Sequence, residues 1–169
     1  ACESGQVIPV YIFDEINSGK FSEGHASKTW LHESLILLNQ SLSGKLLLLE
    51  GNPNQILSKL ALDNNVSFVT WNRCYAPWQI KRDTDIKKTL IDQGIDCKSF
   101  NGSLLWEPWE ILKNDYTPYK VFTPFYRKGC LGSGPPREPL PKPREISYVE
   151  DIICHQTINP KSYSTKNWQ

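Results

Sequence analysis

The sequence predicts an α/β fold in which helices flank a mostly parallel β-sheet. Short apolar segments alternate with amphipathic segments over residues 7–100, and the turns that join them are short. The apolar segments are not polar on one face, which is typical of strands that are covered on both faces. A length of 169 residues with 39% apolar side chains is enough for one domain with a hydrophobic core.

The first predicted strand spans residues 7–13, where β-branched and aromatic side chains follow one another without polar alternation. Pro9 cannot donate a hydrogen bond to a neighbouring strand, so we expect it near the beginning of this strand. The first helix is predicted from near Ser27 to Gly44, because leucines recur there at spacings of four, three and four residues. These leucines are Leu31, Leu35, Leu38 and Leu42.

The next elements continue the alternation. Three further strands are predicted at residues 46–50, 66–71 and 95–100. Asn52 followed by Pro53 predicts the start of the second helix, because a capping side chain precedes the residue that best tolerates the first helical position. A charged third helix is predicted over residues 78–93, with Gly94 as its C-terminal glycine. Right-handed crossovers would connect these parallel strands.

The regular alternation stops after residue 103. Residues 104–112 can form a short helix, and the residues after them have the composition of loops. Five prolines within residues 132–144 predict an extended, semi-rigid segment. We therefore expect an α/β domain at residues 1–131 and, at residues 132–169, a linker that leads into a further domain.

The composition argues against several classes of protein. Lys and Arg number 19 and Asp and Glu number 18, so the net charge of +1 gives no overall reason to expect tight non-specific nucleic-acid binding. The longest apolar run, Leu46–Leu49, is far too short to cross a membrane. The five cysteines are scattered and form no Cys/His cluster at metal-ligand spacing. We expect reduced thiols, no metal site and a cytoplasmic location.

The beginning of the chain predicts that it is a fragment. The sequence contains no methionine and begins Ala-Cys-Glu-Ser-Gly. Such a segment before an apolar run is typical of the last turn of a helix that ends at a glycine. We expect that the chain is cut upstream of Ala1.

No catalytic motif is found in the sequence. It contains no G-x-x-x-x-G-K-[ST] loop, no G-x-G-x-x-G and no G-x-S-x-G elbow. In an open parallel sheet, ligands bind beyond the carboxyl ends of the strands, here near residues 13–14, 50–51, 71–73 and 100–102. The aromatic residues that follow the last two strands are predicted to pack in the core. Alternatively, they form a flat slot for a planar ligand, with Asn72 and Arg73 as hydrogen-bonding groups.

The segment from Tyr119 to Arg144 is locally basic. It contains six basic residues against one acid, Glu138. This excess can contact a phosphate backbone, or it can keep a linker soluble, and the sequence does not distinguish the two.

Four motifs occur together in one known family. They are GHASKTWLHESL at residues 24–35, LLLEGNP at residues 47–53, WNRCYAP at residues 71–77 with Arg82-Asp83, and YKVFTPF at residues 119–125. In order and spacing they resemble the N-terminal domain of the photolyase/cryptochrome family. The resemblance covers about residues 1–145. It is greatest to bacterial class I deoxyribodipyrimidine photolyases.

The resemblance implies a Rossmann-like α/β domain that can hold a light-harvesting antenna chromophore. In this family a C-terminal helical domain binds FAD and UV-damaged DNA, and light energy from the antenna reaches reduced FAD, which donates an electron to split a cyclobutane pyrimidine dimer. An antenna or scaffold role without catalysis is therefore implied for this chain, and DNA repair for the complete protein only. The family's first strand, central in its sheet, is missing here, which would leave unpaired backbone groups between its neighbours.

The antenna residues that the resemblance implies lie near the predicted strand ends and on the first helix. They are Phe13, Asp14, Trp30, Asn72, Arg73 and Tyr75. Tyr75-Ala76-Pro77 stands where many members have Y-E-P, and Gln79 lies near the place where folate-binding members have an acid. Because that carboxylate is missing, a folate antenna is disfavoured relative to a deazaflavin or a flavin, and the absence of any antenna stays open as well.

Two other functions stay open. A cryptochrome-like blue-light photoreceptor would share this domain and differ in its other half. A stand-alone nucleotide-binding or partner-binding α/β module would keep the fold only. The basic, proline-rich segment favours attachment to a further domain over independence.

Overall fold

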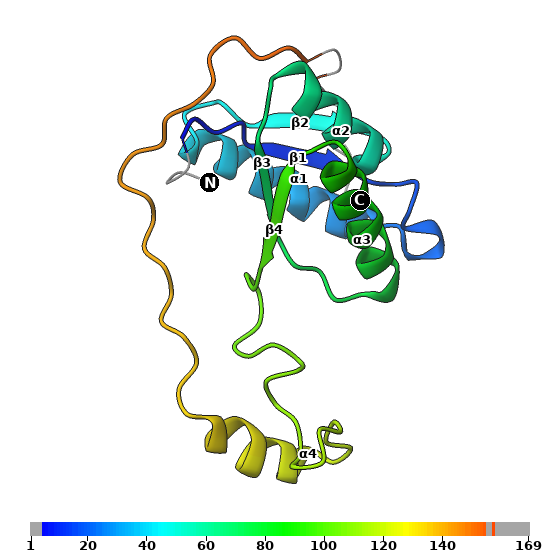
Figure 1. The fold of residues 1–169 in the computed structure, drawn as a ribbon, viewed down its shortest axis with the longest axis vertical. Coiled ribbons are helices and arrows are strands. Elements are labelled where there is room, and N and C mark those ends of the chain that lie inside the picture. Colours follow the sequence, from blue (N-terminus) through cyan, green and yellow to red (C-terminus); the bar gives the residue numbers. More distant parts are fainter. Residues whose placement is uncertain (1–4, 155–156, 158–169) are drawn as a thin grey trace. The chain divides into compact units, whose positions relative to one another are not determined.

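A computed structural model describes residues 5–154 and residue 157 (Figure 1). The chain divides into two compact units, each treated below by itself. Unit 1 comprises Ala1–Thr70, Cys74–Lys98 and Arg144–Gln169, and unit 2 comprises Trp71–Arg73 and Ser99–Pro143. The helical turn expected at residues 1–4 lies outside the described residues. The predicted domain boundary after residue 131 is not tested by this division and stays a prediction.

Strands and helices alternate along the chain as predicted. In order they are β1 (Val10–Phe13), η1 (Gly19–Phe21), α1 (His25–Ser41), β2 (Leu47–Glu50), α2 (Pro53–Asp63), β3 (Phe68–Asn72), α3 (Pro77–Asp92) and β4 (Asp96–Phe100). The Asn52 side chain accepts a hydrogen bond from the Asn54 backbone N–H at 3.0 Å, and Pro53 occupies the first turn of α2. The predicted capping signal is therefore confirmed.

The first strand is shorter than predicted, because Pro9 stands just outside it. β1 begins at Val10, and the carbonyl of Pro9 accepts a hydrogen bond from the Leu47 N–H at 2.9 Å. Before Pro9 the chain pairs elsewhere. The Val7 N–H donates to the carbonyl of Ser147 at 2.8 Å, and Val7 forms a parallel bridge with Tyr148. Part of the predicted linker is thus attached to unit 1.

The described strands form two parallel pairs instead of one continuous sheet. Val10–Phe13 pairs in parallel with Leu47–Glu50, and β3 pairs with β4 in a second two-stranded sheet. The Asp96 N–H donates to the carbonyl of Ser67 at 3.0 Å at one end of this second pair. The α/β class is confirmed, while the single sheet is not.

One part of the core of unit 1 lies between α1 and the β1–β2 pair (Figure 1). Phe13, Leu35, Leu46 and Leu48 form one buried cluster there, and Leu31 and Leu42 pack against it. Burial of each such side chain contributes roughly 1.5–3 kcal/mol. The predicted leucine stripe of α1 is therefore confirmed at three positions, whereas the fourth, Leu38, is 43% exposed.

Two expectations for unit 2 are wrong. Residues 104–112 form turns and no helix, because Pro108 starts a tight turn in which the Glu110 N–H donates to the carbonyl of Glu107. A helical stretch follows where loop was predicted. It comprises α4 (Phe122–Pro124), the π-helix η2 (Phe125–Cys130) and η3 (Leu131–Ser133). Pro124 lies in the first turn, where its missing N–H has no intrahelical partner to lose.

Candidate functional site

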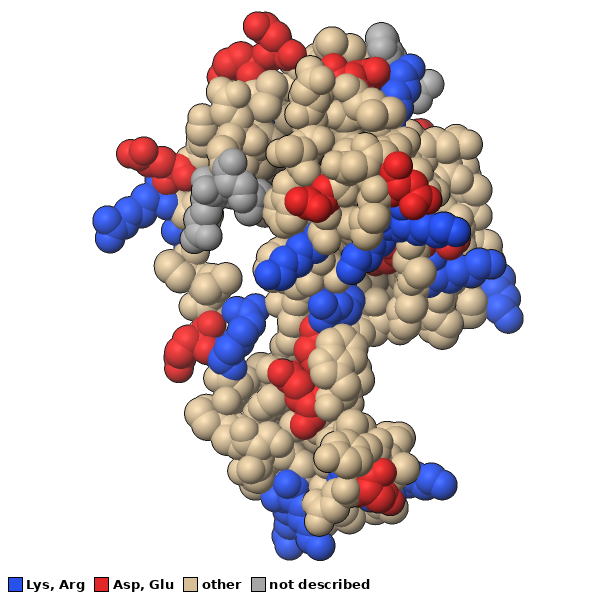
Figure 2. Space-filling model, in the orientation of Figure 1, with Lys and Arg blue, Asp and Glu red and all other residues tan. Residues whose placement is uncertain are grey.

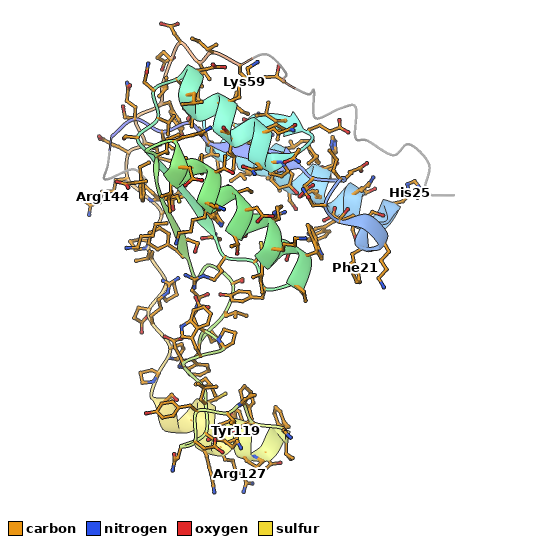
Figure 3. All side chains as sticks on the ribbon, turned by 45° about the vertical axis from the view of Figure 1, so that its right-hand side comes forward. Phe21, His25, Lys59, Tyr119, Arg127 and Arg144 are labelled. Carbon is orange, nitrogen blue, oxygen red and sulfur yellow. The ribbon has the colours of Figure 1, made fainter. Side chains whose placement is uncertain are left out.

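A cavity of about 160 Å³ lies at the carboxyl end of β1, within unit 1. Side chains from β1, the following loop, α1 and α3 line it: Tyr11, Phe13, Asp14, Glu15, Ser18, Phe21, Glu23, Lys28, Leu31, Trp78, Gln79 and Arg82. Phe21 and His25 mark the end of unit 1 at which this loop meets the start of α1 (Figure 3). Rings and apolar carbons thus share the cavity with charged groups and amides.

The loop after β1 is held by Asp14. Its Oδ1 accepts hydrogen bonds from the Asn17 backbone N–H at 3.0 Å and from Asn17 Nδ2 at 2.9 Å. This is the local turn that an aspartate stabilises at the end of a strand. Further along, Glu15 forms an ion pair with Lys28 of α1. The loop is thereby fixed at both the strand and the helix that it connects.

Arg82 of α3 completes the charged side of the cavity. Its Nη1 lies 3.3 Å from Asp14 Oδ2, its Nη2 lies 2.7 Å from Asp83 Oδ1, and its guanidinium lies 5.2 Å from the centroid of the Trp78 ring. The side chains of Asp14 and Arg82 are only 5% and 18% exposed. Burial alone would lower the pKa of Arg82, but the hydrogen bonds and charges of Asp83 and Asp14 outweigh it and raise that pKa. The cation is therefore permanent.

Tyr11 supplies a hydroxyl that stays protonated. Burial raises the pKa of Tyr11 to about 12, and the nearby carboxylate of Glu23 acts in the same direction. A neutral phenol can both donate and accept a hydrogen bond. Its ring also meets Phe13 edge to face, with centroids 4.9 Å apart. Tyr11 thus presents an apolar ring and a polar tip to the cavity.

An open hollow of about 540 Å³ lies beside the cavity along α1. Glu23 and Leu31 line both spaces, and Ala26, Ser27, Trp30 and Ser34 line the hollow alone. The Trp30 side chain is 79% exposed. A large ring that α1 leaves in water beside a cavity is available for contact with a bound molecule.

The structure brings three of the six predicted antenna residues to this region. Phe13, which is 8% exposed, and Asp14 line the cavity, and Trp30 lines the hollow. Tyr75 belongs to unit 1 but lines neither space. Asn72 and Arg73 belong to unit 2.

In unit 2, Arg73 has a structural role. It forms an ion pair with Glu107, which is 6% exposed, and its Nη2 donates to the carbonyl of Ser99 at 3.0 Å. The guanidinium also lies 5.0 Å from the centroid of the Trp109 ring. Asn72 lies against Gly102, where a β-carbon would stand 2.3 Å from the Asn72 Cγ. These contacts occupy Arg73 and fix Asn72 within unit 2.

Sequence reasoning missed Trp78 and Arg82 as lining residues. The sequence does contain a signal for Arg82, because Arg82-Asp83 accompanies the family motif WNRCYAP. This motif lies between β3 and the first turn of α3, at the end of a strand. For Gln79, the sequence predicted only that an amide stands near the place where folate-binding members have an acid. Its Oε1 accepts a hydrogen bond from the Ala76 N–H at 3.4 Å, so the amide also caps α3.

The described residues contain neither a membrane-spanning helix nor a cluster of metal-ligating side chains. No helix in that part of the chain is long and apolar enough to cross a membrane. Among the same residues, no cluster of three or more His, Cys, Asp or Glu side chains has the arrangement of a metal site. In the same residues, Cys74, Cys97, Cys130 and Cys154 are not joined by a disulfide bond.

Comparison with known proteins identifies the family. The family model for DNA photolyase matches residues 1–144. The deoxyribodipyrimidine photo-lyase of Agrobacterium fabrum is 36% identical over 168 residues, which is 98% of this chain and 33% of that protein. Cryptochrome-2 of Arabidopsis thaliana is 35% identical over 147 residues, which is 85% of this chain and 24% of that protein.

A solved structure agrees with these matches. The class III photolyase of Agrobacterium tumefaciens superposes with a TM-score of 0.83 at 32% identity, over 95% of this chain and 33% of that chain. The chain belongs to the DNA photolyase family, as its motifs predicted. It spans a third or less of the length of the relatives named here. Assignment to class I stays a prediction, since this relative is of class III.

Proposed function

We propose that this chain is a light-harvesting antenna domain, in which the cavity of unit 1 holds a planar chromophore. The observation that supports it most is the combination of Phe13, Asp14 and Trp78 around one cavity at a strand end. Parallel sheets bind ligands at this place. No acid, base or nucleophile is needed, because a chromophore supplies the absorption of light and the protein supplies position.

The dimensions of the two spaces support this assignment. The cavity of about 160 Å³ is smaller than the roughly 300–1,000 Å³ that is usual for ligand pockets. The adjoining hollow of about 540 Å³ is open and shares Glu23 and Leu31 with it. A fused ring can therefore insert one edge into the cavity, while the rest of the molecule lies in the hollow beside Trp30.

The polar groups match the edge of such a ring. Tyr11 and Arg82 can donate hydrogen bonds to ring carbonyls, and the Gln79 amide can donate through its nitrogen. The carboxylates of Asp14 and Glu15 are already engaged by Arg82 and Lys28. Glu23 is the further carboxylate in the lining, and it can accept from a ring N–H. A deazaflavin or a flavin offers both carbonyls and such an N–H.

Glu23 also bears on the folate alternative. Gln79 stands near the place where folate-binding members have an acid, and Glu23 offers a carboxylate from a different element. We keep a deazaflavin or a flavin as the proposed antenna, because the amide of Gln79 remains where folate-binding members have an acid. Folate is the competing outcome of the binding experiment.

The activity of the complete protein is inferred from its relatives. The relatives include photolyases and cryptochromes, and this chain corresponds to a third or less of their length. We infer that the complete protein repairs cyclobutane pyrimidine dimers in UV-damaged DNA with electrons from FAD, which a C-terminal domain binds in cis. This chain alone would not catalyse the reaction. A cryptochrome-like photoreceptor would use the same antenna site.

The experiment is a fluorescence titration of the purified chain with four pigments: 8-hydroxy-5-deazaflavin, FMN, FAD and methenyltetrahydrofolate. We expect the deazaflavin or a flavin to bind, and Trp30→Leu to weaken binding by about tenfold through loss of ring contact. Trp30 is 79% exposed, so this change spares the core. Trp109→Leu in unit 2 is the matched control, because Trp109 is also exposed, at 57%.

Three results would decide against the proposal. Binding of none of the four pigments removes the antenna role. Equal effects of Trp30→Leu and Trp109→Leu place a bound pigment outside the hollow. Preferential binding of methenyltetrahydrofolate keeps an antenna but replaces the proposed chromophore.

A further inference from the structure

A surface of unit 2 combines exposed aromatic rings with positive charges, and the antenna site of unit 1 does not use it. Phe122 and Tyr126 lie four residues apart along α4 and η2, with ring centroids 5.8 Å apart and ring planes 6° from parallel. The Phe122 side chain is 72% exposed and that of Tyr126 is 47% exposed. Folding of unit 2 therefore leaves most of this stacked pair in water.

The chain segment that carries these rings has charges of one sign. No acidic residue occurs between Asp115 and Glu138, whereas Lys120, Arg127 and Lys128 are all exposed there. Within the described part of the chain, no salt bridge involves these three side chains. Lys and Arg side chains lie over the part of unit 2 that contains α4 and η2, with an acidic side chain beside them (Figure 2). Arg127 projects from this part of unit 2 (Figure 3).

We propose that this aromatic-basic face, formed by Lys120, Phe122, Tyr126, Arg127 and Lys128, binds single-stranded nucleic acid. Every unpaired base has a flat face that can stack on an exposed ring, and the phosphates between bases need cations at short range. A duplex keeps its bases stacked on each other and offers these rings no base face. The net charge of +1 concerns the whole chain and does not oppose a local patch.

The observations favour a nucleic acid over a protein as the occupant. Lysine is depleted at the centre of protein interfaces, where aromatic residues without a run of like charge are usual. Here Arg127 and Lys128 directly follow Tyr126 in the sequence. The proposal does not depend on a bound pigment, because all five residues belong to unit 2.

The test is the fluorescence anisotropy of a labelled dT oligonucleotide of about 12 residues, titrated with the 169-residue chain at several salt concentrations. If the three cations each neutralise one phosphate, three counterions are released on binding. A plot of the logarithm of the binding constant against the logarithm of the salt concentration should then have a slope of about −2 for a single strand. Phe122→Ala and Tyr126→Ala should each weaken binding by about tenfold. Lys120→Gln, Arg127→Gln and Lys128→Gln should each make the slope shallower by about 0.7.

Matched controls come from α3 in unit 1. Ile91→Ala removes an apolar side chain that is 54% exposed, and Lys88→Gln removes an exposed cation. Neither change should alter the affinity. An abasic oligonucleotide of equal length should bind at least tenfold more weakly, which separates stacking from phosphate contact alone. Circular dichroism of each variant checks that the fold is retained.

Several results would overturn the proposal. They are no binding, equal binding of the abasic strand or of a duplex, and affinities that the Phe122 and Tyr126 substitutions leave unchanged. Concentration-dependent self-association that Phe122→Ala abolishes, without oligonucleotide binding, would instead make this face a contact between proteins.

Discussion

Arg82 joins the middle of α3 to the end of β1, because its Nη1 lies 3.3 Å from Oδ2 of Asp14. Asp83, the next residue of the helix, holds the same guanidinium from its other side. Trp78 lies one turn earlier and faces the guanidinium with its ring. A single cation therefore fixes the distance between two walls of the candidate antenna cavity.

Removal of this cation should destabilise unit 1. Arg82→Gln leaves Asp14, whose side chain is 5% exposed, without its charged partner. We expect the free energy of unfolding to fall by about 3 kcal/mol, because a buried carboxylate then keeps its hydrogen bonds from Asn17 but lacks a counter-charge. Urea denaturation measures the change. The exposed pair of Lys113 and Asp115 is the control, and Lys113→Gln should cost less than about 1 kcal/mol. Equal costs for the two variants would contradict this account of the pair.

Stability should depend on Tyr11 at alkaline pH. Burial raises its pKa to about 12 from 10.0, so the unfolded chain loses this proton first as the pH rises. The contribution of Tyr11 is complete below about pH 10 and is lost as the pH approaches about 12. We expect Tyr11→Phe to reduce the loss of stability between about pH 10 and about pH 12. Tyr116→Phe, at a side chain that is 85% exposed, should leave the alkaline slope unchanged.

Two glycines near the end of the helical stretch of unit 2 should respond differently to alanine. A β-carbon on Gly129 would stand 2.6 Å from Cγ2 of Ile111, whereas nothing lies within 4 Å of one on Gly132. Gly129→Ala should destabilise this stretch by about 1–3 kcal/mol through overpacking. Gly132→Ala should be neutral or slightly stabilising. Hydrogen exchange of the η2 amides reports the difference, and similar exchange rates in both variants would refute it.

The cap of α2 provides a local test. Asn52→Ala removes the side-chain acceptor of the Asn54 N–H and should lower the free energy of unfolding by about 1 kcal/mol. Asn52→Ser restores an acceptor and should recover most of the loss. If thermal or urea unfolding shows no difference between the alanine and serine variants, the cap does not contribute as stated.

The elements of unit 1 follow from local signals, and for that reason the sequence predicted them. The leucine spacing of α1 and the Asn52-Pro53 start of α2 need no knowledge of distant residues. The helical stretch at residues 122–133 was not predicted, because proline and glycine usually indicate loops. Pro124 and Gly129 fit this stretch only at the particular positions that they occupy in it. Gly129 faces Ile111, a contact that only the folded chain reveals.

The candidate site was predicted in part. Strand-end topology pointed to Phe13 and Asp14, which line the cavity, and to Arg73, which pairs with Glu107 within unit 2. The distance in sequence between Asp14 and Arg82 explains why their pairing was not predicted, since residues far apart meet only through the crossover of the fold. Which lining residues hold a pigment stays a prediction.

A crystal structure of this chain with the pigment that binds most tightly tests the antenna assignment most directly. We predict electron density for the ring between Phe13 and Trp78, with a ring heteroatom about 3 Å from Tyr11, Glu23 or Arg82. Density for the pigment at any other surface, with the cavity beside Asp14 holding only solvent, would contradict the assignment.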